Sequence, residues 1–301
     1  MDSTTESVPT RCGYVAIIGR PNVGKSTLLN HLVGQKLSIT SRKPQTTRHN
    51  LLGVLTEGNS QMLLVDTPGI HQPRDRAINR MMVRNAVSVL KDVDLVLLVI
   101  EARGLTADDE LVIAQLERTQ ARTYCLINKI DQLADKSRLL PLIEQLAGLN
   151  CFSEIIPVCA LRGEGLDQLK TLMAEAVPEG PHLFPPDQLT DRSERFVVSE
   201  IVREKLMRRL GDELPHRITV VVDSFQQRDA LADIRATIYV ERDSQKAIII
   251  GRGGERLKSI GRDARLDIEK FLDCKVMLRL WVKVKEGWTN SDSTLQHLGY
   301  D

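Results

Sequence analysis

A short stretch near the start of the chain, GRPNVGKS at 19–26, has residue types that suit phosphate binding. It matches the pattern G-x-x-x-x-G-K-S, with the apolar run YVAIIG (14–19) before it and the helix-forming run STLLNHLVG (26–34) after it. The glycines let successive backbone N–H groups point inward as an anion nest, at a helix start that carries partial positive charge. The stretch therefore predicts a loop that holds a nucleoside triphosphate.

Two side chains of this loop have expected partners. Lys25 can reach the β- and γ-phosphates, and the Ser26 hydroxyl can bind Mg²⁺. We expect the nucleotide contacts of the loop to come from Gly19, Pro21, Asn22, Val23, Gly24, Lys25, Ser26 and Thr27.

The base is indicated by NKID at 128–131, which ends an apolar run. A carboxylate at Asp131 can accept two hydrogen bonds from the N1–H and 2-amino groups of guanine, whereas adenine would leave it unpaired. N-K-x-D alone is more often a turn at a strand end, but its place after a phosphate loop favours guanine. We expect Asn128, Lys129 and Asp131 to bind the base, with Cys159, Ala160 and Leu161 completing the pocket and the Ala160 N–H facing guanine O6.

A third motif, DTPG (Asp66, Thr67, Pro68 and Gly69), follows the run QMLLV. Asp66 would bind Mg²⁺ through water, and the Gly69 N–H can sense the γ-phosphate; the alternative is a simple proline turn. One hydroxyl of Thr46 and Thr47, in SRKPQTTRH, can close over the metal and the γ-phosphate. We expect Asn22, Lys25, Thr47, Asp66 and Gly69 to serve hydrolysis, and Ser26, Thr47 and Asp66 to hold Mg²⁺.

The elements that position these motifs follow from the spacing of apolar residues. Short apolar runs alternate with stretches at helical spacing, such as 77–90 and 133–146. Nearly continuous apolar strands between helices predict a mostly parallel, doubly wound α/β sheet. The apolar runs lie at 14–19, 50–56, 61–66, 94–101, 123–128 and 154–160.

A change of pattern divides the chain. Four prolines between 178 and 186 predict a stiff connector without regular structure. Beyond it, strands flanked by helices without strict alternation predict a smaller α+β domain. We expect a flexible tail at 1–12, a nucleotide domain at 13–177, a linker at 178–191, the second domain at 192–285 and a tail at 286–301.

Composition narrows the class of protein. The 301 residues are 42% hydrophobic and 27% charged, with a net charge of +1, as in soluble globular proteins. The longest apolar run, LVLLVI at 95–100, is far short of the ~20 residues that span a bilayer. Five scattered cysteines predict reduced thiols in a cytoplasm, without a disulfide framework or a zinc site.

The second domain contains a glycine loop in a basic stretch. From 246 to 285 there are eleven Lys and Arg against five Asp and Glu, and GRGG occupies 251–254. A G-x-x-G loop of this kind clamps the backbone of single-stranded RNA in K-homology domains, and the alternative is a solvated basic face. The residues expected to bind RNA are Ile250, Gly251, Arg252, Gly253, Gly254, Arg256, Lys258, Lys283 and Lys285.

Together these residues resemble the Era family of bacterial GTPases. GRPNVGKSTLLN, SRKPQTTRH, DTPG, NKID and the C-terminal WVKVKEGW are similar to that family, from about Tyr14 to the end. The resemblance implies that Thr47, directly before Arg48, is the switch threonine. It also implies a type II K-homology domain in which QKAIII (245–250) is a short helix, although its β-branched residues favour a strand.

Three positions set expectations for activity. Ile70 follows DTPG where Ras-like proteins place a water-orienting glutamine, which predicts slow hydrolysis. Cys159 stands where the family usually has serine, and we expect only a small effect on affinity because backbone contacts serve that role. Asn22 matches an asparagine with which related GTPases hold K⁺, and a turn-stabilising role is the alternative.

The partners expected from the resemblance are GTP and GDP, the 3′ end of small-subunit ribosomal RNA and the small ribosomal subunit. Two function classes remain open: a GTP-hydrolysing switch in subunit assembly, or an RNA-binding factor in which the nucleotide is a structural ligand. Trp281 and Trp288 could stack on RNA, and Trp281 could equally belong to the core. We expect a cytoplasmic monomer and leave peripheral contact with the inner face of the cell membrane open.

Overall fold

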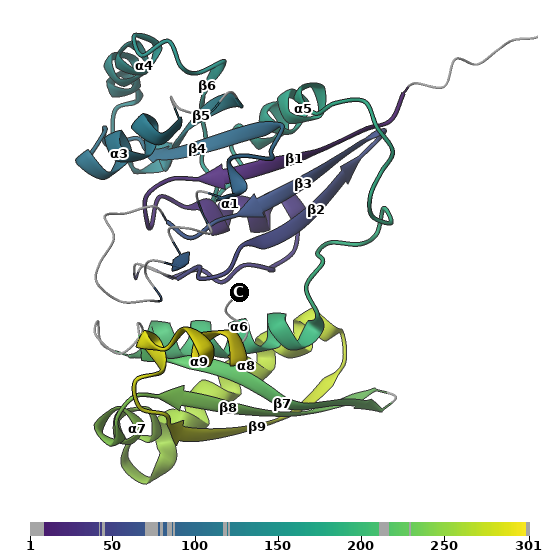
Figure 1. The fold of residues 1–301 in the computed structure, drawn as a ribbon, viewed down its shortest axis with the longest axis vertical. Coiled ribbons are helices and arrows are strands. Elements are labelled where there is room, and N and C mark those ends of the chain that lie inside the picture. Colours follow the sequence, from purple (N-terminus) through teal and green to yellow (C-terminus); the bar gives the residue numbers. More distant parts are fainter. Residues whose placement is uncertain are drawn as a thin grey trace, which may run out of the picture. The chain divides into compact units, whose positions relative to one another are not determined.

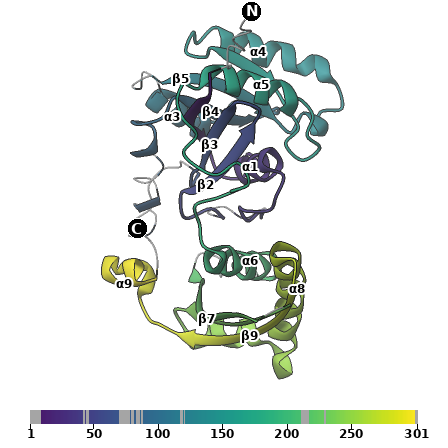
Figure 2. The ribbon, with the colours of Figure 1, turned by 90° about the vertical axis from the view of Figure 1, so that its right-hand side faces the viewer.

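The computed structural model describes residues 9–41, 43, 46–69, 78, 81–82, 86, 88–116, 119, 121–210, 217–228 and 230–298. The chain forms two compact units (Figures 1 and 2). The first unit comprises the described parts of 1–37, 50–72 and 83–191, and the second those of 38–49, 73–82 and 192–301.

The first unit is built on a six-stranded sheet in the order β2-β3-β1-β4-β5-β6. Only β2 pairs antiparallel, with β3, and the other pairings are parallel. This confirms the mostly parallel, doubly wound sheet. The strands are β1 (Arg11–Ile18), β2 (Leu51–Glu57), β3 (Ser60–Asp66), β4 (Leu95–Glu101), β5 (Arg122–Asn128) and β6 (Glu154–Pro157).

Helices cover this sheet because the central strands are apolar on both faces. Buried residues of α3 and α4 pack in one cluster with alternate positions of β1, β4 and β5. In the same unit, α1 lies against β1, β2 and β3, and α5 against β3. The helices are α1 (Lys25–Val33), α3 (Ala107–Leu116), α4 (Leu139–Ala147) and α5 (Leu166–Ala176).

Two predicted boundaries of this unit need correction. β1 begins at Arg11, inside the expected tail, because the Arg11 N–H donates to the Asn59 carbonyl at 2.8 Å and extends the pairing with β3. The proline-rich stretch lacks helices and strands among its described residues, but it is fastened to the first unit. The Gln61 side-chain oxygen accepts the N–H groups of Leu183 and Phe184 at 2.8 and 3.0 Å.

The second unit has the order helix–strand–strand–helix–helix–strand, as the type II K-homology arrangement requires. Its sheet runs β7-β8-β9, with β7 and β8 antiparallel and β8 and β9 parallel. The segment 245–250 is helical despite its β-branched residues, since Ile249 packs into the core and Gln245 caps the helix start. The elements are α6 (Glu194–Arg209), β7 (Thr219–Arg228), β8 (Leu231–Val240), α7 (Asp243–Ile250), α8 (Glu255–Leu272) and β9 (Lys275–Val284).

The C-terminal segment is folded where a tail was expected. It forms η5 (Trp288–Asn290) and α9 (Asp292–His297). Trp288 and Leu295 are buried in a small apolar cluster with Ile78 and Met82. Trp288 is fully buried and therefore cannot stack on RNA, whereas Trp281 is 45% exposed and is not a core residue.

Residues 38–49, which contain the predicted switch threonine, belong to the second unit. The Thr40 N–H donates to Glu204 Oε1 at 3.0 Å, and Arg203 Nη2 donates to the Thr46 carbonyl. Arg48 Nη1 donates to the Ile218 carbonyl at 2.8 Å. The segment is thus held by α6 and by the residue before β7.

No helix in the described part of the chain is long and apolar enough to cross a membrane. The described residues also contain no cluster of three or more His, Cys, Asp or Glu side chains suited to a metal ion.

The segment 38–49 should loosen in acid through His49. Its ring packs edge-on against Phe196 with centroids 5.4 Å apart. Burial lowers the pKa of His49 to about 4, against the attraction of Glu200 and with a smaller contribution from nearby arginines. The unfolded chain binds this proton near the ordinary His pKa of ~6.5, so stability is lost as the pH falls from there towards 4.

We expect His49→Gln, which carries no titrating ring, to remove about 2 kcal/mol of this acid sensitivity. The measurement is the free energy of unfolding of both proteins in steps from pH 7 to pH 4. Wild type should lose more stability than the variant over that range. Parallel curves would contradict the assignment.

Candidate nucleotide and nucleic-acid sites

Four loops of the first unit meet at the carboxyl edge of the sheet. GRPNVGKS follows β1, DTPG begins at the last residue of β3, and NKID begins at the last residue of β5. The segment VCALRGEG (158–165), which contains Cys159, Ala160 and Leu161, follows β6. Loops at the carboxyl ends of parallel strands share one edge, where α/β proteins bind ligands. This edge therefore brings together the predicted nucleotide residues of the first unit.

The phosphate loop adopts the backbone that its glycines allow. Gly19 and Gly24 have φ values of +146° and +109°, and Asn22 has φ +67°. A Cβ on Gly24 would lie 2.3 Å from Asn128 Nδ2, and a Cβ on Gly69 would lie 2.7 Å from the Pro21 nitrogen. Both glycines thus permit close approach between neighbouring loops, and Gly24 also has a backbone conformation that favours glycine.

Lys25 lies inside this loop. Its Nζ donates to the carbonyls of Gly19 and Arg20 at 3.0 Å each, and the residue is 6% exposed. Burial lowers the pKa of Lys25 to about 8, while the charge of Asp66 raises it. A polyphosphate would give this buried ammonium a partner of full opposite charge.

The predicted magnesium residues of the first unit are in contact. Ser26 Oγ donates to Asp66 Oδ2 at 2.7 Å, and Asp66 is fully buried. Next to it, Thr67 Oγ1 donates to the Ile17 carbonyl at 2.9 Å and fixes the start of DTPG against β1. A hydroxyl and a carboxylate are oxygen donors of the kind that Mg²⁺ prefers, so these residues fit the ion.

The side chain of Asn128 joins three loops. Its Nδ2 donates to the Val23 carbonyl at 2.8 Å, and its Oδ1 accepts the Ala160 N–H at 3.0 Å. The Ala160 N–H, which we expect to face guanine O6, thus also has a protein partner in Asn128, and its contact with the base stays a prediction. The side chain of Leu161 points into solvent, with 73% exposed.

Cys159 makes a contact that sequence reasoning did not anticipate. Its Sγ donates to Asp131 Oδ1 at 3.2 Å, and burial followed by the Asp131 hydrogen bond raises the pKa of the thiol. The cysteine thus contacts, through its side chain, the carboxylate that is predicted to recognise the base. A thiol is a weaker donor than the usual serine hydroxyl, so this position should affect Asp131 directly.

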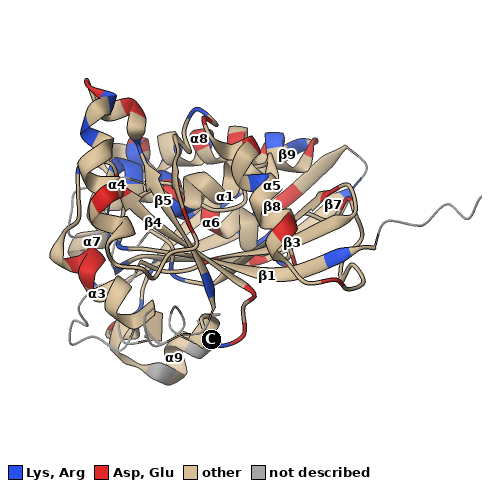
Figure 3. Cartoon of the chain, turned by 90° about the horizontal axis from the view of Figure 1, so that it is seen from above, with Lys and Arg blue, Asp and Glu red and all other residues tan. Residues whose placement is uncertain are grey.

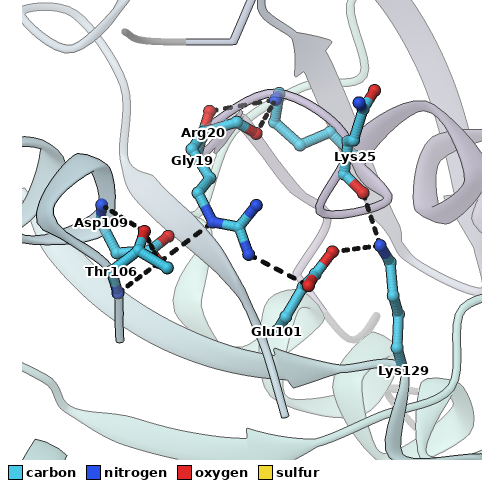
Figure 4. Close-up of polar contacts among 8 residues, drawn as sticks. Gly19, Arg20, Lys25, Glu101, Thr106, Asp109 and Lys129 are labelled. Carbon is cyan, nitrogen blue, oxygen red and sulfur yellow. Dashed lines mark hydrogen bonds and ion pairs between the residues drawn. The ribbon is translucent and has the colours of Figure 1, made fainter. Parts of the chain in front are cut away.

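An ionic network links the phosphate loop to NKID (Figure 4). Lys129 Nζ donates to the Asn22 carbonyl at 2.6 Å and forms an ion pair with Glu101. Glu101 also pairs with Arg20 at 3.0 Å, and Arg20 pairs with the fully buried Asp109 at 3.1 Å. Burial raises the pKa of Glu101, but Lys129 and Arg20 outweigh it and hold that pKa below its usual value.

Sequence reasoning missed Glu101 and Asp109. The available signal was an acidic residue at the end of the apolar strand β4, at the same edge as the motifs. Thr47 lies in the segment of the second unit described above, and Ile70 falls outside the described residues.

The second candidate site is the glycine loop of the second unit. Gly251, Gly253 and Gly254 have positive φ values between α7 and α8. A cavity of about 460 Å³ lies beside this loop, and Figure 3 colours the Lys and Arg positions along α8 and β9 blue. Its lining residues are Gly254, Leu257, Lys258, Gly261, Arg262, Arg265, Leu278 and Leu280.

Not all predicted RNA residues line this cavity. Gly254 and Lys258 do, and so do Arg262 and Arg265, which sequence reasoning missed. Arg256 instead donates to the Ile248 carbonyl at 2.6 Å and holds the end of α7. Lys285 lies over the ring of Tyr239, at 5.9 Å from its centroid, and away from the lining set.

Comparisons with known proteins agree with these two sites. A family profile described as "50S ribosome-binding GTPase" matches residues 14–129, and one described as "KH domain" matches residues 213–289. GTPase Era of Ectopseudomonas mendocina is 54% identical over 98% of this chain and 99% of its own length. The chain belongs to the Era family of GTPases. GTPase Era of Azotobacter vinelandii is 53% identical with the same coverage.

Two solved Era structures are similar over nearly the whole chain. One is Era in complex with MgGDPNP and nucleotides 1506–1542 of 16S ribosomal RNA, with a TM-score of 0.93 and 39% identity. The other is an Aquifex aeolicus Era variant bound to GDP.AlF4-, with the same TM-score and identity. Each covers 97% of this chain and 99% of the compared chain.

Glu101 is expected to act as a positioning residue for Lys129 and Arg20. Glu101→Gln should weaken nucleotide binding about tenfold, because the amide leaves Lys129 without a carboxylate partner and Arg20 with Asp109 alone. The measurement is the Kd for GDP by calorimetry. The matched control is Glu57→Gln, which breaks the ion pair of Glu57 with Lys170, two residues outside the nucleotide loops. Equal affinities in both variants would refute the role.

Proposed function

We propose that this chain is a GTP-hydrolysing switch that binds the 3′ end of small-subunit ribosomal RNA and assists assembly of the small ribosomal subunit. The main support for this function is that one chain combines four nucleotide loops in the first unit with a basic cavity beside the G-x-x-G loop in the second. The similar Era structure with MgGDPNP and 16S ribosomal RNA supports the same pairing of ligands.

In this proposal the nucleotide is held from both ends. Lys25 and the backbone N–H groups of the phosphate loop bind the β- and γ-phosphates. Ser26 and Asp66 would hold Mg²⁺, which neutralises charge on the phosphates when bound. Asp131 accepts the guanine donors, and Lys129 packs along the base while its ammonium stays tied to Glu101 and the Asn22 carbonyl.

Hydrolysis requires the segment that contains Thr47 to close over the γ-phosphate. Thr47 would leave its place in the second unit and join the γ-phosphate with Gly69. Because Ile70 has no polar atom to orient water, we propose that turnover of the chain alone is slow. The competing function, an RNA-binding factor with a structural nucleotide, predicts that small subunits leave this turnover unchanged. A rise in turnover on adding small subunits supports the switch.

Guanine specificity should reside in Asp131. Asp131→Asn should shift preference from GTP to xanthosine triphosphate by at least about a hundredfold, because xanthine has a carbonyl where guanine has its amino group. Competition binding measures the change. Asp135→Asn is the control, since Asp135 only caps the nearby turn at Ser137. Undiminished GTP preference in Asp131→Asn would remove the assignment.

Potassium is a further part of the proposal, with Asn22 as its ligand. The positive φ of Asn22 also suits an asparagine in a turn, so the experiment must distinguish the effect of the side-chain amide from that of the backbone conformation. Asn22→Gly keeps that backbone accessible and deletes only the amide. Turnover in KCl should exceed that in NaCl at equal ionic strength, and the difference should vanish in Asn22→Gly. Potassium stimulation that survives in the variant would exclude Asn22.

RNA binding should depend on the glycine loop. Gly253 has φ +60°, a left-handed backbone that aspartate tolerates better than most residues, and a Cβ there would meet nothing within 4 Å. Replacing Arg252 and Gly253 by aspartates should therefore strain only this exposed loop, and circular dichroism and GDP binding check that the variant is folded. The two negative charges should repel the RNA backbone and weaken binding of a small-subunit 3′-end oligonucleotide about a hundredfold or more. GDP affinity, measured in parallel, should stay at the wild-type value. Wild-type RNA affinity would make the basic stretch a solvated face.

The proposal also places the chain in the cytoplasm as a monomer that can touch the inner face of the cell membrane. Sedimentation of the purified protein, alone and with anionic lipid vesicles, tests the monomeric state and the membrane contact.

A further inference from the structure

We propose that the open face of the sheet in the second unit is a second RNA-binding surface, which receives nucleotides that flank those held at the glycine loop. The inference rests on the proposed RNA-binding function and adds a surface to it. This "outer face" is defined by residues of two neighbouring strands. They are Leu231, Asp233, Arg235, Thr237 and Tyr239 of β8 and Lys275, Met277, Arg279, Trp281 and Lys283 of β9. Thr237 is itself buried, since its hydroxyl donates to Asp223 and its neighbours cover it, and the other residues are at least partly exposed.

Strand alternation puts these residues on one side of the sheet. The intervening residues, such as Ile234, Ile238 and Val282, belong to the core cluster that packs against α6 and α8. In the parallel pairing, Thr237 lies opposite Trp281 and Tyr239 opposite Lys283. Side chains paired in this way share a face. The helices therefore cover one face of the sheet, and the outer face is the other.

Large apolar side chains are exposed on this face. Trp281 and Met277 are each 45% exposed, and Leu231 is 43% exposed. Such a group on neighbouring strands marks an interaction surface more often than a scattered exposed leucine does. Trp281 is not a member of the core cluster of the second unit, whose residues lie on the opposite side of β9.

The positive charges around Trp281 favour a negatively charged partner. Along β9, Arg279 and Lys283 flank it at two-residue spacing, and Arg235 lies directly opposite Arg279. Like charges in such a cross-strand pair are destabilising, so the fold alone does not favour them. Among the described residues, Arg235, Lys275 and Lys283 make no ion pair, while Arg279 pairs with Asp233 at 2.9 Å.

Cations around an exposed aromatic ring are the chemistry of a single-strand binding platform. A base can stack on the indole of Trp281, while neighbouring cations meet phosphates. A second copy of this chain fits less well, because unpaired lysines are depleted from the centres of protein interfaces.

Continuity with the glycine-loop cavity also favours RNA. β9 is an edge strand of the sheet. Leu278 and Leu280 of β9 line the cavity, while Met277, Arg279 and Trp281 alternate with them on the outer face. An RNA strand that leaves the cavity therefore has only this one edge strand to pass before it meets the outer face.

The test compares two single-stranded RNAs from the small-subunit 3′ end with the full-length protein. One has about four nucleotides, enough for the glycine loop, and the other extends it by roughly ten. Trp281→Ala should weaken binding of the longer RNA about tenfold and leave the short RNA unchanged. Trp281→Phe should restore most of the affinity. Lys283→Glu should act like Trp281→Ala, whereas Arg195→Glu, an equal charge change on exposed Arg195 of α6, should have little effect.

Wild-type binding of the longer RNA by Trp281→Ala and Lys283→Glu would overturn the inference. So would equal weakening of both RNAs, which would place the effect at the glycine loop. Self-association of the wild type that Trp281→Ala abolishes would identify the face as an interface between copies instead. Failure of wild type to bind the short RNA would refute the glycine-loop assignment alone, because the longer RNA still reports on the outer face.

Discussion

The buried amide of Asn128 is the contact on which the nucleotide site depends. It donates to the phosphate loop at Val23 and accepts from the loop after β6 at Ala160. It has room only because Gly24 lacks a Cβ, which would lie 2.3 Å from the amide nitrogen. The second glycine of the motif thus serves the guanine end of the site as well as the phosphate end. One hydrogen-bonded side chain fixes the spacing between the two.

A chain of ion pairs forms a second connection between the phosphate loop and the base motif. Glu101 holds Lys129 of the base motif and Arg20 of the phosphate loop, and Asp109 holds Arg20 from α3. Partly buried charges in such a chain are costly to separate, so each fixes the position of the next. Both connections are formed by protein atoms alone, so we expect them to arrange the loops before a nucleotide arrives. Preorganisation of this kind lowers the entropy that binding must overcome.

The sequence predicted the sheet, the motifs and the division of the chain because each rests on local spacing. Apolar runs define strands, and their carboxyl ends share an edge, so Lys25, Asp66 and Asn128 could be placed together. Contacts between distant segments carried no such signal. Glu101 looked like any strand-terminal acid, and the roles of the two tryptophans depended on tertiary packing: Trp288 is enclosed by Ile78 and Leu295, and Trp281 is exposed. Likewise, the helix at 245–250 opposes its β-propensity because Ile249 packs into the core.

The central claim is that Asn128 assembles the nucleotide loops in advance of the ligand. Hydrogen exchange at the Ala160 amide in nucleotide-free protein tests it directly, because that N–H donates to the Asn128 side chain. The account predicts protection of this amide in wild type and its loss in Asn128→Ala, with exchange in β4 and β5 unchanged. Rapid exchange at Ala160 in nucleotide-free wild type would contradict it and would mean that the nucleotide itself brings the loops together.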